Sequence, residues 1–309
     1  MIVVVTGANG FIGSHLVDAL VARGDEVRRV VRADFASDRF EQIVRGADVV
    51  VHAAAATRAP TREGLRASNV ALTERALSAA RQANVGRFVF ISSQAAAGPA
   101  LSWDRPVRED DAPAPVEAYG ESKRDAEYLV RASGLPATIV RPAAVYGPRD
   151  RDFRALFSLA RRGLAIHPGN RAQWISIVHV RDCVAAIIAA MTCDAAVGRT
   201  YFVANDEPVQ WSTLFALAQR AAGASSRLEV EVPLPLVRLG ALFGDAMARM
   251  TGQASLLTSE KVALSMAPFW ICANDRAKHE LGVVPRIPLI DGIAETCQWF
   301  SQTSGSSAP

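Results

Sequence analysis

The chain has 309 residues, of which 50% are hydrophobic and 21% charged, and its formal net charge is +3. This ordinary globular composition allows one large or two modest domains. Arginines are interleaved with acidic residues, so the sequence indicates no nucleic-acid-binding surface. No run of about 18 apolar residues is free of charge, and the apolar opening MIVVVTG lacks a basic leader, so we expect neither a transmembrane helix nor a signal peptide.

The cysteine pattern points to a reducing compartment. Cys183, Cys193, Cys272 and Cys297 form no C-x-x-C pair and have no histidine at metal-ligand spacing. We therefore expect free, buried thiols in a cytoplasmic protein without a metal site.

The N-terminal half alternates short β-rich runs with helical patterns. Strands are expected at 2–6, 26–32, 48–52, 87–92 and 137–141, and helices at 11–23, 69–84 and 118–133. This alternation predicts right-handed βαβ units in a doubly wound parallel α/β sheet of the Rossmann type, with both faces covered.

The regular alternation of strands and helices ends after Tyr146. A helix is expected at 153–162, and strands at 176–180 and 200–204 flank a helix at 183–191 with Asp182 as its N-cap. We expect a nucleotide-binding domain of 1–165 plus about 176–204. A smaller, mainly helical substrate lobe takes about 166–175 plus 205–300, and 301–309 form a flexible tail.

The segment TGANGFIG joins the first strand to the first helix, where a dinucleotide fingerprint belongs. Gly7 allows the tight turn, Gly10 lets backbone approach a pyrophosphate, and Gly13 lets helix and strand pack closely. The helix N-terminus then offers N–H groups to the phosphates.

The second strand ends in EVRRVVRAD, which bears on the choice of dinucleotide. An acid at this point holds the ribose 2′-hydroxyl of NAD, whereas an arginine accommodates the 2′-phosphate of NADP. Arg32 favours NADP, while Asp34 could serve the opposite preference. The alternative for Arg32 is a solvated arginine at the sheet edge.

Tyr119 and Lys123 stand four residues apart in AYGESKR, so a helix places them on one face. A tyrosine pKa of about 10 is too high for proton exchange near neutrality. A lysine charge one turn away favours the phenolate and lowers that pKa by roughly 1–3 units.

The ordered set of motifs resembles the extended short-chain dehydrogenase/reductase superfamily. The set comprises TGANGFIG, His52-Ala53-Ala54, Ser92-Ser93, Tyr119-x-x-x-Lys123 and Arg141-Pro142 followed by Tyr146-Gly147-Pro148. It covers residues 1 to about 185 strongly and continues weakly to about 300. The superfamily contains nucleotide-sugar epimerases and dehydratases, hydroxysteroid dehydrogenases and dihydroflavonol reductases.

The resemblance implies a catalytic set of Tyr119 as general acid/base, Lys123 as its tuning residue and ribose ligand, and Ser93, rather than Ser92, as the group that binds the substrate oxygen. It implies contacts with NADP(H), or alternatively NAD(H), from Gly7, Asn9, Gly10, Phe11, Ile12, Gly13, Arg32, Ala53, Ala54, Ala55, Asn69, Tyr119, Lys123, Pro142 and Val145. Asn69 has a structural hydrogen-bonding role as its alternative. The family's four-helix dimer implies a homodimer through the Tyr–Lys helix, with Glu121, Arg124 and Tyr128 at the interface.

Two departures from the family pattern shape the expected function. Only ADFASDRFEQIVRGA separates Arg32 from Asp48, so a short helix at 38–45 replaces the usual edge strand. In RPAAVYGP, Ala143 and Ala144 stand where nucleotide-sugar enzymes often carry a diphosphate-binding asparagine. The segments LPLVRLGALFGDAMARM and MAPFW suggest an apolar pocket, with helix packing as their alternative.

We therefore expect an oxidoreductase that moves hydride between nicotinamide and a carbonyl or secondary alcohol of a small, fairly apolar substrate. One alternative is a nucleotide-sugar epimerase or dehydratase with tightly bound NAD, for which Arg171, Arg238 or Arg276 would bind the diphosphate. Another is a catalytically silent NADP-sensing regulator. Arg149 and Arg151 are either contacts for an anionic substrate or part of a solvated loop.

Overall fold

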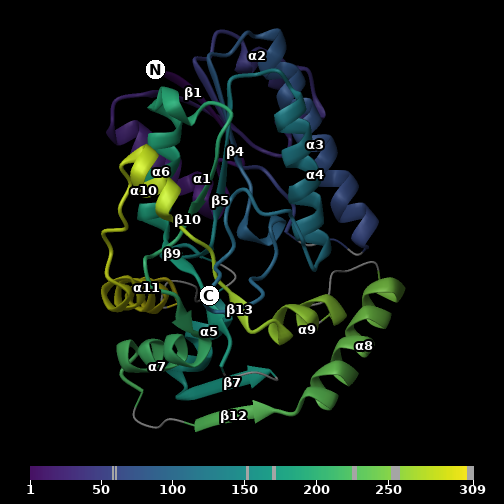
Figure 1. Cartoon of the computed structure of the whole chain (residues 1–309), viewed down its shortest axis with the longest axis vertical. Helices are drawn as coiled ribbons and strands as arrows, with labels where there is room; N and C mark the ends of the chain where they lie inside the picture. Colours follow the sequence, from purple (N-terminus) through teal and green to yellow (C-terminus); the bar gives the residue numbers. More distant parts are fainter. Residues whose placement is uncertain are drawn as a thin grey trace.

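A computed structural model describes residues 1–57, 59, 61–150, 153–168, 172–224, 228–251 and 258–304. A six-stranded parallel sheet in the order β10-β5-β4-β3-β1-β2 fills the upper part of the molecule in Figure 1. Its strands are β1 (Ile2–Thr6), β2 (Glu26–Val30), β3 (Val49–His52), β4 (Arg87–Ile91), β5 (Ala137–Pro142) and β10 (Thr200–Val203). The Rossmann prediction is thereby confirmed.

Helices cover both faces of this sheet. Because side chains alternate along a strand, Val3 and Val5 of β1 face one helical layer and Val4 faces the other. Both faces are therefore buried and the strands are continuously apolar. The first layer contains α1 (Phe11–Ala22) and α6 (Val180–Thr192), and the second contains α2 (Arg39–Val44), α3 (Arg62–Gln82) and α4 (Ala118–Ala132).

β2 is one of the two edge strands, and no strand lies between it and β3 in the chain, as the short intervening segment predicts. A 3-10 turn at Asp34–Ala36 and helix α2 occupy the segment instead. Arg75 of α3 donates hydrogen bonds to the carbonyl oxygens of Phe35 and Ser37, which ties this substitute for a strand to the second helical layer.

A smaller lobe lies below the sheet in Figure 1. Its helices are α5 (Arg154–Arg161), α7 (Trp211–Ala221), α8 (Leu234–Thr251), α9 (Ser259–Met266) and α11 (Leu289–Ser304), while α10 (Asp275–Leu281) packs beside the upper sheet. Short strand pairs accompany them: β6 (Ala144–Tyr146) with β9 (Ile177–His179), β7 (Leu164–Pro168) with β12 (Leu228–Val232), and β8 (Trp174–Ile175) with β11 (Val209–Gln210) and β13 (Phe269–Trp270). β6, β8, β9, β11 and β13 have only two or three residues each, which is too short to leave a clear alternating pattern in the sequence.

Several element ends differ from the expected ones. α3 begins at Arg62, seven residues early, because the Thr61 hydroxyl accepts a hydrogen bond from the Gly64 backbone N–H and caps the helix. α11 continues to Ser304, so 301–304 are helical and 305–309 lie outside the described residues.

Asp182 is not the N-cap of α6, which was a wrong expectation. The helix starts at Val180, and the His179 ring caps it by accepting from the Arg181 backbone N–H. Asp182 instead accepts hydrogen bonds from the backbone N–H groups of Arg286 and Ile287, 3.0 Å each. Its carboxylate therefore joins the C-terminal segment to the sheet layer.

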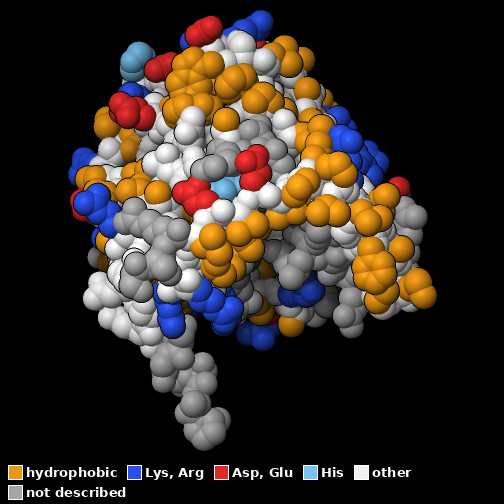
Figure 2. Space-filling model, turned by 90° about the horizontal axis from the view of Figure 1, so that it is seen from below, with side chains coloured by type: hydrophobic (Ala, Val, Ile, Leu, Met, Phe, Trp, Pro, Cys, Tyr) orange, Lys and Arg blue, Asp and Glu red, His pale blue; other side chains and the backbone are white. Residues whose placement is uncertain are grey.

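Helix α8 exposes an apolar face. Val237 and Ala241 pack inward against Val262, whereas Leu239 and Phe243 are 65% and 70% exposed. In the view from below, hydrophobic side chains gather on the side of the molecule where α8 lies (Figure 2). Within the described part of the chain, no helix is both long enough and apolar enough to cross a membrane.

Candidate functional site

The glycine turn after β1 is shaped by close backbone contacts. Gly7 has φ of +68°, and a Cβ there would lie 2.8 Å from the backbone nitrogen of Ala54. A Cβ at Gly13 would overlap the Gly7 carbonyl oxygen, so glycine lets α1 start directly against the turn. Gly10 is the N-cap of α1, whose first N–H groups face the C-terminal edge of the sheet.

A cavity of about 440 Å³ opens at this edge. The residues expected to bind cofactor or substrate that line it are Gly7, Gly10, Phe11, Ile12, Gly13, Ala53, Ala55, Ser93, Tyr119, Lys123, Pro142 and Val145. They come from the ends of β1, β3, β4 and β5, from the first turns of α1 and α4, and from β6. Parallel strands bring their C-terminal ends to one edge, and ligands of open α/β sheets bind there.

Tyr119 lies in the first turn of α4, which packs tightly on the segment after β4. A Cβ at Gly120 would overlap the carbonyl oxygen of Ala95, so glycine permits this approach. Ser93 caps the short turn at Gln94–Ala96, and its Oγ accepts a hydrogen bond from the Ala95 backbone N–H, 3.1 Å. The Ser93 hydroxyl hydrogen is then available as a donor at the cavity wall.

Lys123 is held in the wall of the cavity rather than in solvent. Its Nζ donates a hydrogen bond to the Ile91 carbonyl oxygen, 2.7 Å, and lies 4.9 Å from the Phe90 ring centre and 5.9 Å from the Tyr119 ring centre. Burial lowers the pKa of Lys123 to about 8, while the Glu127 carboxylate acts to raise it. The ammonium is therefore charged at neutral pH and close to its titration range.

His52 at the end of β3 connects the end of β1, which leads into the glycine turn, with α3. Thr73 Oγ1 donates to the Asn69 carbonyl oxygen and lies 3.3 Å from His52 Nε2, while Thr6 Oγ1 accepts from the Ala54 N–H and lies 2.8 Å from His52 Nδ1. The ring is thus neutral with its proton on Nε2. Burial, followed by the Lys123 charge, lowers the pKa of His52 to about 3.

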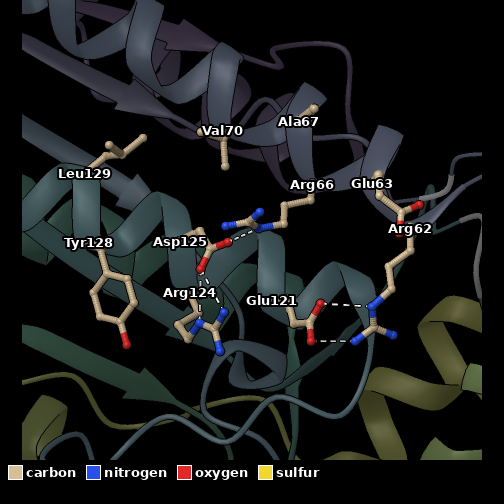
Figure 3. Close-up of a pocket in the computed structure, with 10 residues that line it drawn as sticks. All are labelled: Arg62, Glu63, Arg66, Ala67, Val70, Glu121, Arg124, Asp125, Tyr128 and Leu129. Atoms are coloured by element: carbon tan, nitrogen blue, oxygen red, sulfur yellow. Dashed lines mark hydrogen bonds and ion pairs between the residues drawn. The ribbon is translucent and has the colours of Figure 1, made fainter.

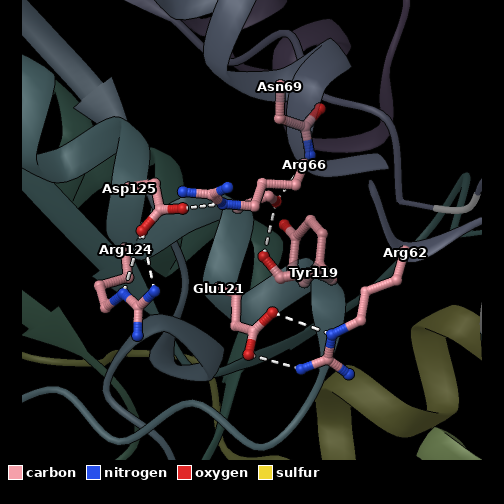
Figure 4. Close-up of polar contacts among 8 residues, drawn as sticks. Arg62, Arg66, Asn69, Tyr119, Glu121, Arg124 and Asp125 are labelled. Carbon is pink, nitrogen blue, oxygen red and sulfur yellow. Dashed lines mark hydrogen bonds and ion pairs between the residues drawn. The ribbon is translucent and has the colours of Figure 1, made fainter. Parts of the chain in front are cut away.

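Asn69 makes structural contacts. Its Oδ1 accepts from the Ala56 N–H, 2.7 Å, and its Nδ2 donates to the Ala56 carbonyl and to Ser122 Oγ, 2.9 Å each. Ser122 Oγ in turn donates to the Tyr119 carbonyl oxygen, 2.7 Å. Figure 4 shows Asn69 on α3 and Tyr119 at the start of α4, the two residues that these contacts connect. Asn69 therefore fixes the backbone that carries Tyr119.

Four residues expected to bind cofactor, namely Asn9, Arg32, Ala54 and Asn69, are not among those lining the cavity. Arg32 is exposed just beyond β2. Asp34 is buried, and its Oδ2 accepts from the Val31 N–H, 2.8 Å, while Oδ1 lies 3.6 Å from Arg39 Nε. The Asp34 carboxylate thus stabilises the loop that follows β2.

The cavity also contains Thr57, Ile91, Asp150 and Phe153, which the sequence reasoning missed. Ser92, Ala143 and Ala144, which it named without assigning them to the cofactor, line the cavity as well. Asp150 follows the Tyr146-Gly147-Pro148 motif, and the break in pattern after Tyr146 could have directed attention to this segment. Asp150 is 3% exposed and its Oδ1 accepts from the Phe153 N–H.

A second hollow, of about 750 Å³, lies between α3 and α4. Figure 3 shows two ion pairs across it, Arg62 with Glu121 and Arg66 with Asp125. Tyr128 lines the same hollow and is 54% exposed. Glu121, Arg124 and Tyr128, expected at a dimer interface, therefore share one surface.

Among the residues that the structure describes, no group of three or more His, Cys, Asp or Glu could hold a metal ion. All four cysteines are free, and Cys183, Cys272 and Cys297 are buried.

The family model described as "NAD dependent epimerase/dehydratase family" matches residues 3–204. The chain is 30% identical to the ceramide reductase of Caulobacter vibrioides, covering 97% of this chain and 94% of that protein. It is 28% identical to the UDP-glucose 4-epimerase of Vibrio cholerae, covering 98% and 96%. The crystal structure of UDP-glucuronic acid 4-epimerase from Bacillus cereus, in complex with UDP-glucuronic acid and NAD, matches with a TM-score of 0.79 at 21% identity over 98% of this chain and 100% of that one, which shows a shared fold.

Proposed function

Since the chain belongs to the NAD dependent epimerase/dehydratase family, we propose that it is an NADP(H)-dependent oxidoreductase acting on a carbonyl or secondary alcohol of a small, fairly apolar substrate. The observation that carries this proposal is the single cavity into which the glycine turn, Ser93, Tyr119 and Lys123 converge. Bound there, the nicotinamide supplies or accepts the hydride.

Three side chains of this protein carry out the proton transfer and the charge stabilisation. Ser93 donates its hydroxyl hydrogen to the substrate oxygen and stabilises the charge that develops on it. Tyr119 gives a proton to that oxygen during reduction and takes one from the alcohol during oxidation. The Lys123 ammonium stabilises the Tyr119 phenolate. Ser92 is unsuited to the role of Ser93 because its buried hydroxyl donates to Glu127, 2.6 Å.

The turn fits a dinucleotide by its shape. Side chains at Gly7 or Gly13 would fill the space where the backbone approaches itself and the first turn of α1. For NADP over NAD, the support is local. Asp34 is engaged by the Val31 N–H and Arg39, and Arg32 is exposed at the end of β2 to meet a 2′-phosphate.

Two observations favour an apolar substrate. Ala143 and Ala144 line the cavity beyond Pro142, so this part of the wall offers methyl groups rather than an amide. The relative that is 30% identical over nearly its whole length is a ceramide reductase. The substrate class we propose is a small apolar ketone or secondary alcohol.

The epimerase alternative keeps one supporting observation, the full-length similarity to a UDP-glucose 4-epimerase. Of the arginines named for the diphosphate, Arg276 pairs with Asp110, Arg238 is exposed on α8 and contacts Met266 Sδ, and Arg171 lies outside the described residues. Of the two arginines named for an anionic substrate, Arg149 pairs with Asp18, 2.7 Å, and Arg151 lies outside the described residues.

Tyr119→Phe tests the reaction. Removing a general acid/base lowers turnover by roughly 10²- to 10⁴-fold, whereas Tyr128→Phe on the exposed side of the same helix leaves it unchanged. The assay follows NADPH oxidation with small apolar ketones, and UDP-sugars are tested as substrates of the epimerase alternative. Full turnover by Tyr119→Phe would contradict the proposed chemistry. A wild-type protein that binds NADPH but turns over none of the substrates would favour the silent regulator.

We also propose that the protein is a cytoplasmic homodimer joined through α3 and α4. Tyr128 and the ion pairs around the hollow in Figure 3 form the surface, and its free cysteines suit a reducing compartment. Tyr128→Asp buries a charge at such an interface, so we expect it to yield a monomer in sedimentation. A wild-type monomer would contradict the dimer.

A further inference from the structure

A buried carboxylate lies one helical turn beyond Lys123. Glu127 of α4 is 1% exposed, and Arg141 of β5 is equally buried. Arg141 donates two hydrogen bonds to it, from Nε to Oε1 at 2.8 Å and from Nη2 to Oε2 at 2.6 Å. Ser92 Oγ adds a third, 2.6 Å to Oε1. Burying such a pair costs desolvation free energy, so its presence calls for a reason other than stability.

Lys123 and Glu127 of α4 both form hydrogen bonds at the end of β4, directly before the proposed catalytic residue Ser93. Lys123 binds the carbonyl oxygen of Ile91, and Glu127 binds the hydroxyl of the next residue, Ser92. Ser93 follows directly and enters the cavity. Two side chains of one face of α4 therefore hold two successive residues at the end of β4.

Glu127 is also the acidic group that acts on the Lys123 charge. The charged and titratable groups around Lys123 are Tyr119 and Glu127 on α4, His52 on β3 and, beyond Glu127, Arg141 on β5. His52 is neutral, and the Arg141 charge is directed to Glu127. Because burial works against the ammonium, the carboxylate one turn away opposes that effect.

We infer that Glu127, held by Arg141 and Ser92, is a positioning residue for the Tyr119–Lys123 pair: it supports the Lys123 ammonium and fixes the strand end that presents Ser93. This inference rests on the proposed function, in which Lys123 stabilises the Tyr119 phenolate. Glu127 acts through Lys123 and lines no part of the cavity itself.

The test needs no substrate. The ultraviolet absorbance of phenolate is followed against pH, and subtracting the curve of the matching Tyr119→Phe variant isolates Tyr119 from the other three tyrosines. Glu127→Gln removes the carboxylate that favours the charged form of Lys123. We therefore expect the Tyr119 phenolate to form at a pH higher by roughly one unit. An unshifted titration would overturn the inference, since a merely structural residue would leave that pH unchanged.

A second variant covers a failure of Glu127→Gln to fold, which would leave Arg141 buried without its partner. Glu127→Gln combined with Arg141→Met removes both charges, and the same upward shift is expected. The matched control is Arg131→Gln. Arg131 contacts Glu127 from the exposed side, 3.3 Å, and its removal leaves the Glu127 charge in place, so the titration should not move.

Turnover separates this inference from the proposed function. If Tyr119→Phe retains full turnover, the proposed function fails. If Tyr119→Phe loses turnover while Glu127→Gln shows an unshifted Tyr119 titration, the proposed function stands and the role of Glu127 is wrong.

Discussion

At the scale of single residues, Lys123 shows how a reactive group costs stability. Its pKa falls from 10.5 to about 8 on burial. Between these values the folded state binds fewer protons than the unfolded state, so the free energy of unfolding rises with pH through this window. Below pH 8 the cost is complete, and at 1.36 kcal/mol per unit it amounts to about 3 kcal/mol.

Lys123→Met should therefore abolish turnover yet stabilise the fold. The lost hydrogen bond to the Ile91 carbonyl offsets about 1 kcal/mol, leaving a gain of about 2 kcal/mol at pH 7 that shrinks as the pH rises above 8. Urea unfolding of both proteins at several pH values measures it. A destabilised variant at pH 7 would mean that burial of the ammonium is not costly here.

At the scale of elements, the glycine turn and α1 form one unit. Gly13→Ala places a methyl group against the Gly7 carbonyl oxygen, so α1 must move away from the turn. We expect at least a tenfold loss of NADPH affinity, together with roughly 1–3 kcal/mol of destabilisation. Fluorescence titration with NADPH and urea unfolding measure the two effects.

Gly24→Ala, at the other end of α1, is the control. Gly24 has φ of +88° and open space around its Cα, so alanine strains the backbone without a collision. It should cost about 1 kcal/mol of stability and leave NADPH affinity unchanged. Equal affinities for Gly13→Ala and the wild type would show that the turn does not hold the cofactor.

The same elements show how far a sequence can be interpreted. The parallel sheet, the missing edge strand and the helix that carries Tyr119 and Lys123 were predictable because apolar runs and turn residues specify them locally. The start of α3 was not, since REGLRAS lacks an apolar stripe and its cap at Thr61 acts through one hydroxyl. Contacts between distant segments, such as Arg141 with Glu127 or Asp182 with Arg286, leave no mark in a single sequence.

At the scale of the whole molecule, a smaller lobe lies below the six-stranded sheet (Figure 1), and we propose that it surrounds the substrate while the end of the sheet carries the reacting groups. The sequence left open whether the apolar run of α8 packs or lines a pocket. The helix buries Val237 and Ala241 but exposes Leu239 and Phe243, so packing accounts for only part of it. Reductases and epimerases of this family share the fold, so the fold does not distinguish between them. Whether the dinucleotide is exchanged or stays tightly bound does distinguish them.

The most direct measurement is therefore made on the purified protein alone. It is denatured, any released dinucleotide is identified, and the cofactor-free wild type and Arg32→Ala are titrated with NADPH and NADH. The account predicts an empty protein that binds NADPH at least tenfold more tightly than NADH, about 1.4 kcal/mol, with the preference lost in Arg32→Ala. Stoichiometric release of NAD would contradict it, since tightly held NAD belongs to an epimerase that regenerates its own cofactor.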